Sequence, residues 1–216
     1  MRGMICVAIL GLITLPIGAA DDKNEAAGWV SLLEGGDLGK HIQTEGNWKL
    51  DDKGVVTLTP RKGESGWTRW KSYLWAKQTY TDFEIEFEYM VRKGGNSGFY
   101  FRVGDVNEPV KTGIEVQIVE TGSKPKADKL TDHHSGALIP SIPPTKDSAK
   151  PAGEWNKFHI TSKGDKLTVV LNGVTVNEVD LAQAKLKDRP RTGSIGFQDH
   201  GLPLSLRNIR VRDLSK

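Results

Sequence analysis

The sequence alternates apolar and polar side chains with a period of two over several short runs, and this alternation restricts the fold more than any other feature. In the run Phe83–Tyr89, aromatic and aliphatic side chains occupy every second position, and glutamates stand between them. Successive side chains of a β-strand point to opposite faces, so this run predicts a strand with one face on a core. We interpret Glu84, Glu86 and Glu88 as its solvated face, and not as a catalytic acid cluster.

Two more alternating runs, residues 94–103 and 114–118, carry the chemically richest side chains of the chain. Their apolar faces are predicted to hold Phe99, Phe101, Val103, Ile114, Val116 and Ile118. Their polar faces are predicted to hold Asn96, Tyr100, Arg102, Glu115 and Gln117. If the two strands lie in one sheet, joined by a polar loop, these polar side chains share one open surface. Arg102 and Glu115 could also simply form a cross-strand ion pair there.

Turn signals separate about a dozen such short runs, and almost no helix is indicated. The strongest hairpin signal is Asn172-Gly173, which stands between two runs rich in valine and leucine. Only Leu181–Asp188 predicts a helical turn. The chain is therefore expected to be all-β, a two-sheet antiparallel β-sandwich of the jelly-roll type, with residues 28–216 as a single domain.

Residues 1–20 have the order of a signal peptide for export. Arg2 precedes an apolar run, and the small residues Gly18–Ala20 precede the charged residues Asp21–Lys23. The apolar run is short for a membrane span, so we expect cleavage after Ala20, a flexible leader at residues 21–27 and no stable membrane anchor. A secreted or periplasmic location follows. Cys6 lies within the signal, so the mature chain has no cysteine and forms no disulfide.

Charge and motifs exclude several function classes. The formal net charge is +3, and residues of both signs are interleaved, so nucleic acid is not an expected partner. The chain lacks a G-x-S-x-G elbow, an H-E-x-x-H motif, a phosphate loop and a dinucleotide fingerprint. It also lacks the paired carboxylates of ordinary glycosidases, because Gln117 occupies the next same-face position after Glu115.

What remains is a set of polar and aromatic side chains that suits sugar hydroxyls. The polar members are Asn96, Arg102, Glu115, Gln117, Gln198, Asp199 and His200. The aromatic members are Trp67, Trp70 and Trp75, which could be stacking platforms or simply core residues. His133 and His134 lie in a long loop, Thr121–Gly153. As neighbours in extended chain they point apart, so they are not expected to chelate one metal together.

Several pieces of the sequence, read in order, resemble one family. They are GWVSLLEGGDL, NSGFYFR, GIEVQI, Gly136-Ala137, GEWNKFHI, LNG, IGFQDHG and the final RNI. Together, over Gly28 to Leu214, they resemble the 3-keto-disaccharide hydrolase domain family, whose fold is like that of the concanavalin A-type lectins and glucanases. The shared motifs fall on Asn96, Ser97, Gly98, Arg102, Gly113, Glu115, Gln117 and residues 198–201. One departure is Val119-Glu120, where many relatives carry an aspartate.

The resemblance implies a secreted or periplasmic bacterial enzyme that acts on glycosides oxidised at C3 of the sugar. A C3 ketone acidifies the C2 proton, so a base can remove it and the enolate can expel the C1 substituent before water adds. We expect Glu115 or His200 as base, Arg102 as enolate stabiliser and Asp199 as the group that orients His200. The substrate-binding candidates are Asn96, Gln117, Gln198, Trp67 and Trp70. A divalent metal on Glu115, Asp199 and His200 is an alternative stabiliser.

Two other function classes stay open from the sequence. The same fold hosts many lectins, so a non-catalytic carbohydrate-binding module is the first alternative. That reading gains if the tryptophans line one groove while His200 points away from it. An exported structural or adhesive domain is the second alternative, and a featureless groove would support it.

Overall fold

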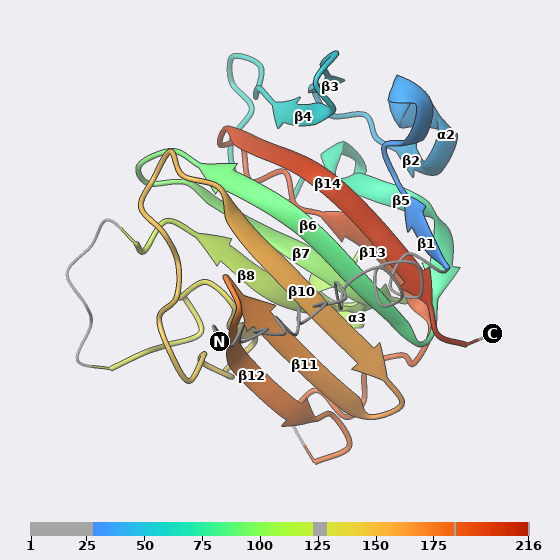
Figure 1. Ribbon diagram of the computed structural model, residues 1–216, viewed down its shortest axis with the longest axis vertical. Coiled ribbons are helices and arrows are strands. Elements are labelled where there is room, and N and C mark those ends of the chain that lie inside the picture. Colours follow the sequence, from blue (N-terminus) through green and yellow to red (C-terminus); the bar gives the residue numbers. More distant parts are fainter. Residues whose placement is uncertain (1–27, 123–128, 184, 216) are drawn as a thin grey trace, which may run out of the picture.

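Two antiparallel sheets packed face to face make up the computed structural model, which describes residues 28–122, 129–183 and 185–215 (Figure 1). The eight-stranded sheet has the order β12 (Val174–Asp180), β11 (Lys166–Leu171), β10 (Asn156–Lys163), β6 (Phe83–Val91), β14 (Leu204–Asp213), β4 (Val55–Leu58), β3 (Trp48–Leu50), with β1 (Trp29–Ser31) also paired to β14. The six-stranded sheet has the order β2 (Ile42–Gln43), β5 (Leu74–Tyr80), β13 (Gly193–Phe197), β7 (Asn96–Val103), β8 (Ile114–Val119), β9 (Leu138–Ile139). The predicted all-β sandwich is confirmed.

The core fills the space between the sheets, and the predicted alternation places it there. Along β6, every residue from Phe83 that falls on the odd positions is buried, and the residues between them are partly exposed. Phe87 of β6 contacts Phe99 and Phe197 of the other sheet, with ring centroids 5.4 and 4.8 Å apart. Aromatic pairs at this spacing add to the stabilisation that burial provides. Rings from strands distant in sequence therefore hold the two sheets together.

Strands β7 and β8 are antiparallel neighbours, as the sequence predicts, with Tyr100 opposite Glu115 and Gly98 opposite Gln117. The predicted face of Val103 is wrong, however. Arg102 has a φ of +52°, and the pairing of β7 with β13 shifts register beside it. A bulge of this kind breaks the period of two. Val103 consequently packs on the outer face of the six-stranded sheet and not in the main core.

The helical turns lie elsewhere than the sequence predicts. Leu181–Asp188 forms turns and no helix in the part described, and its two buried leucines stand five residues apart, which does not match a helical face. The short helical elements are η1 (Glu34–Gly36), α2 (Leu38–His41), η2 (Trp70–Ser72) and α3 (Pro109–Thr112). α3 stands in the β7–β8 connection, where only a polar loop was expected. Proline at its first turn suits a helix start, because the missing N–H has no partner to lose there.

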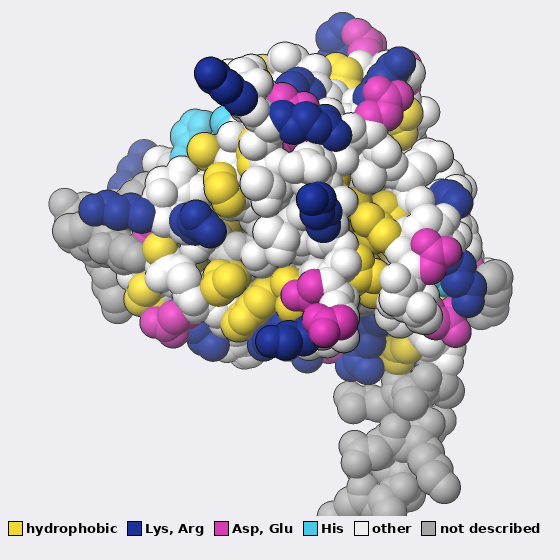
Figure 2. Space-filling view, turned by 90° about the horizontal axis from the view of Figure 1, so that it is seen from above, with side chains coloured by type: hydrophobic (Ala, Val, Ile, Leu, Met, Phe, Trp, Pro, Cys, Tyr) yellow, Lys and Arg dark blue, Asp and Glu magenta, His cyan; other side chains and the backbone are white. Residues whose placement is uncertain are grey.

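Two predicted segments lie outside the described residues: the signal peptide at residues 1–20, which contains Cys6, and the leader at residues 21–27. Among the described residues, no helix has the length and apolar character needed to cross a membrane. The face in Figure 2 carries positive and negative side chains side by side, with apolar side chains between them.

The outer face of the eight-stranded sheet is an ordered row of ion pairs. Glu84, Glu86 and Glu88 of β6 pair with Arg212, Arg210 and Arg207 of β14, respectively. Because β6 and β14 are antiparallel neighbours, these side chains meet at matching registers. We call this row the glutamate–arginine ladder. The expectation that the three glutamates form a surface strand face is correct, and the arginine partners are what the sequence did not reveal.

Candidate functional site

A cavity of about 290 Å³ opens on the outer face of the six-stranded sheet, and we call it the Glu115 pocket. Six of the predicted site residues line it: Trp67, Asn96, Glu115, Gln117, Gln198 and His200. They come from β7, from β8, from the loop before η2 and from the segment that follows β13. The structure thus joins parts of the chain that are far apart in sequence. The fold also adds four lining residues without a predicted role in the site: Tyr100, Val110, His133 and Ile139.

Glu115 lines this pocket and is buried, with 8 % of its surface exposed. Tyr100, directly across the β7–β8 pair, donates its hydroxyl to Glu115 Oε2 at 2.6 Å. Burial raises the pKa of the Glu115 carboxyl to about 7, although the hydrogen bond from Tyr100 works in the opposite direction. The alternative of an Arg102–Glu115 ion pair is wrong, since Tyr100 is the partner. A carboxyl that titrates near neutral pH is suited to acid–base chemistry.

Each residue of the Asn-Ser-Gly run at the start of β7 makes a different contact near the pocket. Asn96 Nδ2 lies 3.3 Å from His200 Nε2 at the pocket wall, and an amide N–H can only donate, so His200 Nε2 accepts. Ser97 Oγ donates to the carbonyl of Gln198 at 2.8 Å and ties β7 to the segment after β13. Gly98 lies under Glu115, and a Cβ there would overlap the carboxylate. A glycine is therefore needed for Glu115 to lie flat on the sheet.

Asp199 does not orient His200, which corrects the role expected for it. Its carboxylate is fully buried, pairs with Arg69 and accepts the N–H of Gly201 at 2.8 Å. Burial raises the pKa of Asp199, and the Gly201 N–H and Arg69 act against that rise. The Asp199–Arg69 pair anchors the loop that carries Trp67 to the strand segment that carries Gln198 and His200. Asp199 is thus a positioning residue for the loop that carries Trp67.

The last residue of the Gln-Asp-His-Gly run, Gly201, has to be a glycine for two structural reasons. Its φ is +75°, a conformation that favours glycine, and a Cβ there would come within 2.6 Å of Ser65 Cα. The loop before η2 can pack against the end of the run only because this side chain is missing. Gln198 and His200 face the pocket, while Asp199 and Gly201 fix the loop above it.

Arg102 lies outside the Glu115 pocket, so its predicted part as enolate stabiliser is not supported by its position. It is 2 % exposed, and its Nη2 donates to the carbonyl of Gly164 in the β10–β11 turn. That contact ties β7 of one sheet to a turn of the other. Its side chain lines a different hollow, together with Asp165 and Arg191. The bulge at Arg102 is the cause, because its left-handed backbone turns the side chain away from the face that Tyr100 occupies.

The three tryptophans divide into three environments. Trp67 is 44 % exposed and lines the Glu115 pocket. Trp70 contacts it, with ring centroids 5.3 Å apart, and lines a neighbouring hollow. Trp75 is buried, and its Nε1 donates to the Trp70 carbonyl at 2.9 Å. Trp67 therefore has the exposure of a stacking platform, and Trp75 is structural. A pure binding module was expected to have His200 pointing away from the groove that the tryptophans line. Trp67 and His200 line the same pocket, so this expectation is not met.

The predicted metal set does not come together as three ligands. Among the described residues, no group of three His, Cys, Asp or Glu side chains is arranged to hold a metal ion. Asp199 directs its carboxylate to Arg69 and Gly201, leaving Glu115 and His200 as the members that reach the pocket. Glu120, at the position where relatives carry aspartate, is buried just beyond β8 and does not line the pocket.

Three contributors could not be chosen from the sequence. Tyr100 was placed on the correct face, but only the cross-strand register shows that it holds Glu115. Arg69 lies in a charge-rich loop, and its aspartate partner is 130 residues away. His133 lines the pocket while His134 Nδ1 accepts the Thr131 N–H at 3.1 Å, so the two neighbours do point to different partners. The signal for His133 was its place in a long loop, which is weak.

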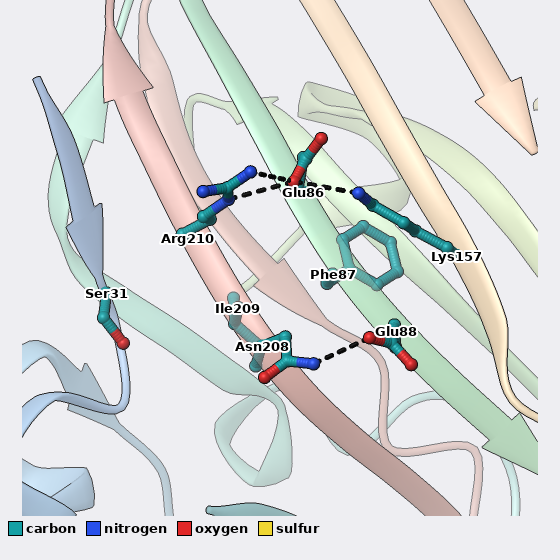
Figure 3. Close-up of a pocket in the computed structure, with 8 residues that line it drawn as sticks. All are labelled: Ser31, Glu86, Phe87, Glu88, Lys157, Asn208, Ile209 and Arg210. Atoms are coloured by element: carbon teal, nitrogen blue, oxygen red, sulfur yellow. Dashed lines mark hydrogen bonds and ion pairs between the residues drawn. The ribbon is translucent and has the colours of Figure 1, made fainter. Parts of the chain in front are cut away.

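A second hollow, of about 350 Å³, lies on the opposite sheet at the ladder (Figure 3). Figure 3 shows Glu86 between Arg210 and Lys157, with Asn208 directed at Glu88. The hollow is formed where β14 bulges at Asn208, whose φ is +53°. Its carboxylates already have cationic partners, so their charge is compensated within the protein. Among the described residues, no cation pairs with the Glu115 carboxyl, whose partner is Tyr100.

The two antiparallel sheets place the chain among the β-sandwich domains, with a polar pocket on one outer face. The chain belongs to the 3-keto-alpha-glucoside-1,2-lyase-like domain family, whose model matches residues 28–212. It is 30 % identical over 172 residues to a 3-keto-disaccharide hydrolase from Bacteroides thetaiotaomicron, covering 62 % of this chain and 59 % of that relative. The chain thus spans about three fifths of the relative's length.

Solved structures show the same fold. A candidate glycosyl hydrolase from Parabacteroides distasonis superposes with a TM-score of 0.72 at 25 % identity, covering 86 % of this chain and 99 % of that one. A carbohydrate-binding module from Bacillus subtilis superposes with a TM-score of 0.52 at 14 % identity, covering 86 % of this chain and 96 % of that one. The second likeness concerns the fold alone, because one fold hosts unrelated functions.

Proposed function

We propose that this chain cleaves glycosides that carry a ketone at C3 of the sugar, by removing the C2 proton and eliminating the substituent at C1. The observation that carries this proposal is Glu115, a buried carboxyl in an open pocket with a pKa of about 7. A general base is most effective when its pKa lies near the working pH. Membership of the 3-keto-alpha-glucoside-1,2-lyase-like family and the name of the Bacteroides relative support the substrate class.

The reaction balances with water as the only co-reactant. Glu115 takes the C2 proton, and the electrons of that C–H bond form an enolate over C2, C3 and the ketone oxygen. The enolate then expels the C1 substituent, which leaves with a proton, and a C1=C2 double bond forms. Water finally adds its hydroxyl to C1 and a proton to C2. The net change is hydrolysis of the glycosidic bond.

The other pocket residues fit the remaining roles in this proposal. Gln117 offers a neutral N–H donor in the pocket, so it replaces Arg102 as the group that would stabilise the enolate oxygen, while Gln198 hydrogen-bonds to Tyr73 and Tyr100. His200 would protonate the leaving oxygen as an imidazolium, through its Nδ1–H, with the Asn96 amide turned so that its otherwise unpartnered Oδ1 accepts the Nε2–H. Trp67 supplies an exposed ring on which a sugar can stack.

A non-catalytic carbohydrate-binding module is the second candidate, and one observation favours it. Trp67 is among the two most exposed large apolar side chains of the described chain, as expected for a stacking surface that needs no chemistry. A binding face, however, gains nothing from a buried carboxyl with a raised pKa, because an uncharged amide would cost less to bury.

Turnover of a 3-keto glucoside with a chromogenic leaving group, beside its unoxidised parent, tests the proposal. Cleavage of the keto form alone supports elimination through an acidic C2 proton. Cleavage of both forms at similar rates would point to ordinary glycoside hydrolysis and overturn it. Binding of sugar without cleavage of either form would assign the chain to the binding modules. A parallel series with a chelator measures whether a metal takes part.

A further inference from the structure

A hollow of about 300 Å³ is lined by residues of the β7 bulge, of the β10–β11 turn and of the segment between β12 and β13, and we call it the Arg102 hollow. Its charged lining consists of four cationic and two acidic side chains: Arg102, Lys187, Arg189, Arg191, Asp165 and Asp188. The cations exceed the carboxylates by two. The chemistry proposed for the Glu115 pocket uses none of these side chains.

Arg102 is the buried cation of this hollow, and it has no carboxylate partner. Its side chain is 2 % exposed, Nη2 donates to the neutral carbonyl of Gly164, and within the described part of the chain Nε has no hydrogen-bond partner. Burial lowers the pKa of Arg102, and the nearby charge of Arg191 acts in the same direction. A buried guanidinium without a counter-charge is costly, so the hollow is short of negative charge.

The two carboxylates whose charge reaches Arg102 are held by other partners. Asp165 pairs with Arg191, and Asp82 accepts the N–H of Gly164 at 2.9 Å. A Cβ added to Gly164 would lie 3.6 Å from Nη2 of Arg191, so that guanidinium lies beside the residue whose carbonyl Arg102 holds. Two guanidinium groups therefore border one glycine of the β10–β11 turn.

Hydrogen bonds fix the walls of the Arg102 hollow. The Leu181 N–H donates to the carbonyl of Asp165 at 2.7 Å and ties the segment after β12 to the β10–β11 turn. Arg189 Nη2 donates to the carbonyl of Val110 at 3.0 Å and ties the same segment to α3. Leu181 and Leu186 are buried and give the hollow an apolar side. A hollow that is formed in advance loses less conformational freedom when a ligand binds.

We infer that the Arg102 hollow binds an oxyanion group, a carboxylate, sulfate or phosphate, at a site separate from the Glu115 pocket. Guanidinium groups suit such a ligand, because their planar fork of N–H donors matches two oxygens of one anion. The apolar side of the hollow can take a short carbon body attached to that group. The ladder differs, since each of its arginines already has a glutamate partner. This inference does not rest on the proposed function.

Calorimetric titration of the wild-type chain with phosphate, sulfate and acetate tests the inference, with chloride used to hold the ionic strength constant. We expect phosphate and sulfate to bind saturably, with one anion per chain. Acetate binding would extend the site to carboxylates, and its absence would restrict the site to tetrahedral anions. If none of the three anions binds saturably, the inference is overturned.

Exposed residues supply variants with matched controls. Lys187→Gln removes one cation of the lining and is expected to weaken phosphate binding about fivefold, whereas Lys185→Gln, an exposed lysine outside the lining, changes it less than about twofold. Asp165→Asn frees Arg191 and is expected to tighten binding about threefold, with the exposed Glu178→Gln as its control. Equal effects in variant and control would mean diffuse attraction by net charge and no defined site.

Arg102→Gln tests the central residue. It keeps an N–H donor for the Gly164 carbonyl but removes the charge, so phosphate binding is expected to fall at least about tenfold. Phosphate should raise the Tm of the wild-type chain, because a ligand of the folded state stabilises it, and should leave the Tm of the variant unchanged. An equal rise in both proteins would overturn the inference. If Arg102→Gln does not fold, the Lys187 and Asp165 variants decide the question.

Discussion

Glutamates on the outer faces of the two sheets have opposite acid–base properties. On the eight-stranded sheet, burial disfavours the charged form of Glu86, but hydrogen bonds from Arg210 and Lys157 outweigh it, so its pKa is lowered. On the six-stranded sheet, burial raises the pKa of Glu115 to about 7, and its partner is the neutral Tyr100. The comparison teaches that the partner decides what a strand-face glutamate does: a cation makes it structural, and a neutral donor in a buried pocket leaves it free to exchange a proton.

The largest expected effect comes from removing the carboxyl of Glu115. Glu115→Gln keeps the shape and can still accept the Tyr100 hydrogen bond, but it cannot take a proton. If Glu115 is the base, kcat/KM on a 3-keto glucoside falls by about 10²–10⁴-fold. Glu86→Gln on the other face is the matched control and is expected to leave turnover unchanged. Equal activity of wild type and Glu115→Gln would remove Glu115 from the base position and move that part to His200.

The next effect contrasts a buried ion pair with an exposed one. Asp199→Ala removes the buried partner of Arg69 and leaves it with Glu64 alone, 3.4 Å from its Nη1. The free energy of unfolding is expected to fall by about 2 kcal/mol, because guanidinium N–H groups lose their buried acceptor. Asp199→Ala is also expected to raise KM, because Arg69 anchors the loop that carries Trp67. Urea unfolding and steady-state kinetics measure the two effects. A loss below that of a ladder variant would show that the pair adds no stability.

The pH dependence sharpens the comparison further. Glu115 has a folded pKa near 7, above its unfolded value of 4.5, so its stabilising contribution is complete below pH 4.5 and is lost as the pH rises through 7. The loss reaches up to about 3 kcal/mol at the top of that window, and Glu115→Gln is expected to abolish it. Glu86 acts in the opposite direction, because its folded pKa is lowered: its contribution is present above pH 4.5 and is lost on acidification.

Activity has its own pH signature. If the ionised Glu115 is the base, kcat/KM rises as the pH passes through about 7. Tyr100→Phe removes a hydrogen bond that favours the carboxylate, so this rise is expected to move to higher pH. A pH–rate profile of wild type and of Tyr100→Phe measures the rise and its shift. If kcat/KM rises at the same pH in both proteins, the Tyr100 hydroxyl does not influence the pKa of Glu115.

The smallest effect is expected in the ladder. Arg212→Ala removes the partner of Glu84 at a site where both side chains are partly exposed, with 29 % and 16 % of their surfaces accessible. Such pairs contribute about 0–1 kcal/mol, and salt screens them. Unfolding in low and high salt checks this, with a smaller difference expected in high salt. A loss as large as that of Asp199→Ala would show that the ladder is a cooperative network.

Much of the fold could be predicted from the sequence, because a buried strand face requires alternation and a tight turn requires particular residues. The β6 pattern, the β7–β8 pair and the hairpin at Asn172-Gly173 all followed from these local rules. The grouping of Asn96, Glu115, Gln117, Gln198 and His200 in one pocket followed from the alternation together with the family motifs.

Only the tertiary structure decided which strands are neighbours and where a bulge interrupts the alternation of a strand. The left-handed backbone at Arg102 reversed the alternation, so a residue predicted beside Glu115 ties the two sheets together instead. The pairing of Asp199 with Arg69, and of the β6 glutamates with β14 arginines, joins residues more than a hundred positions apart. Composition and spacing determine which side chains face outward; which outward glutamate meets an arginine and which meets a tyrosine depends on strand order and register, and these are set by the whole sandwich.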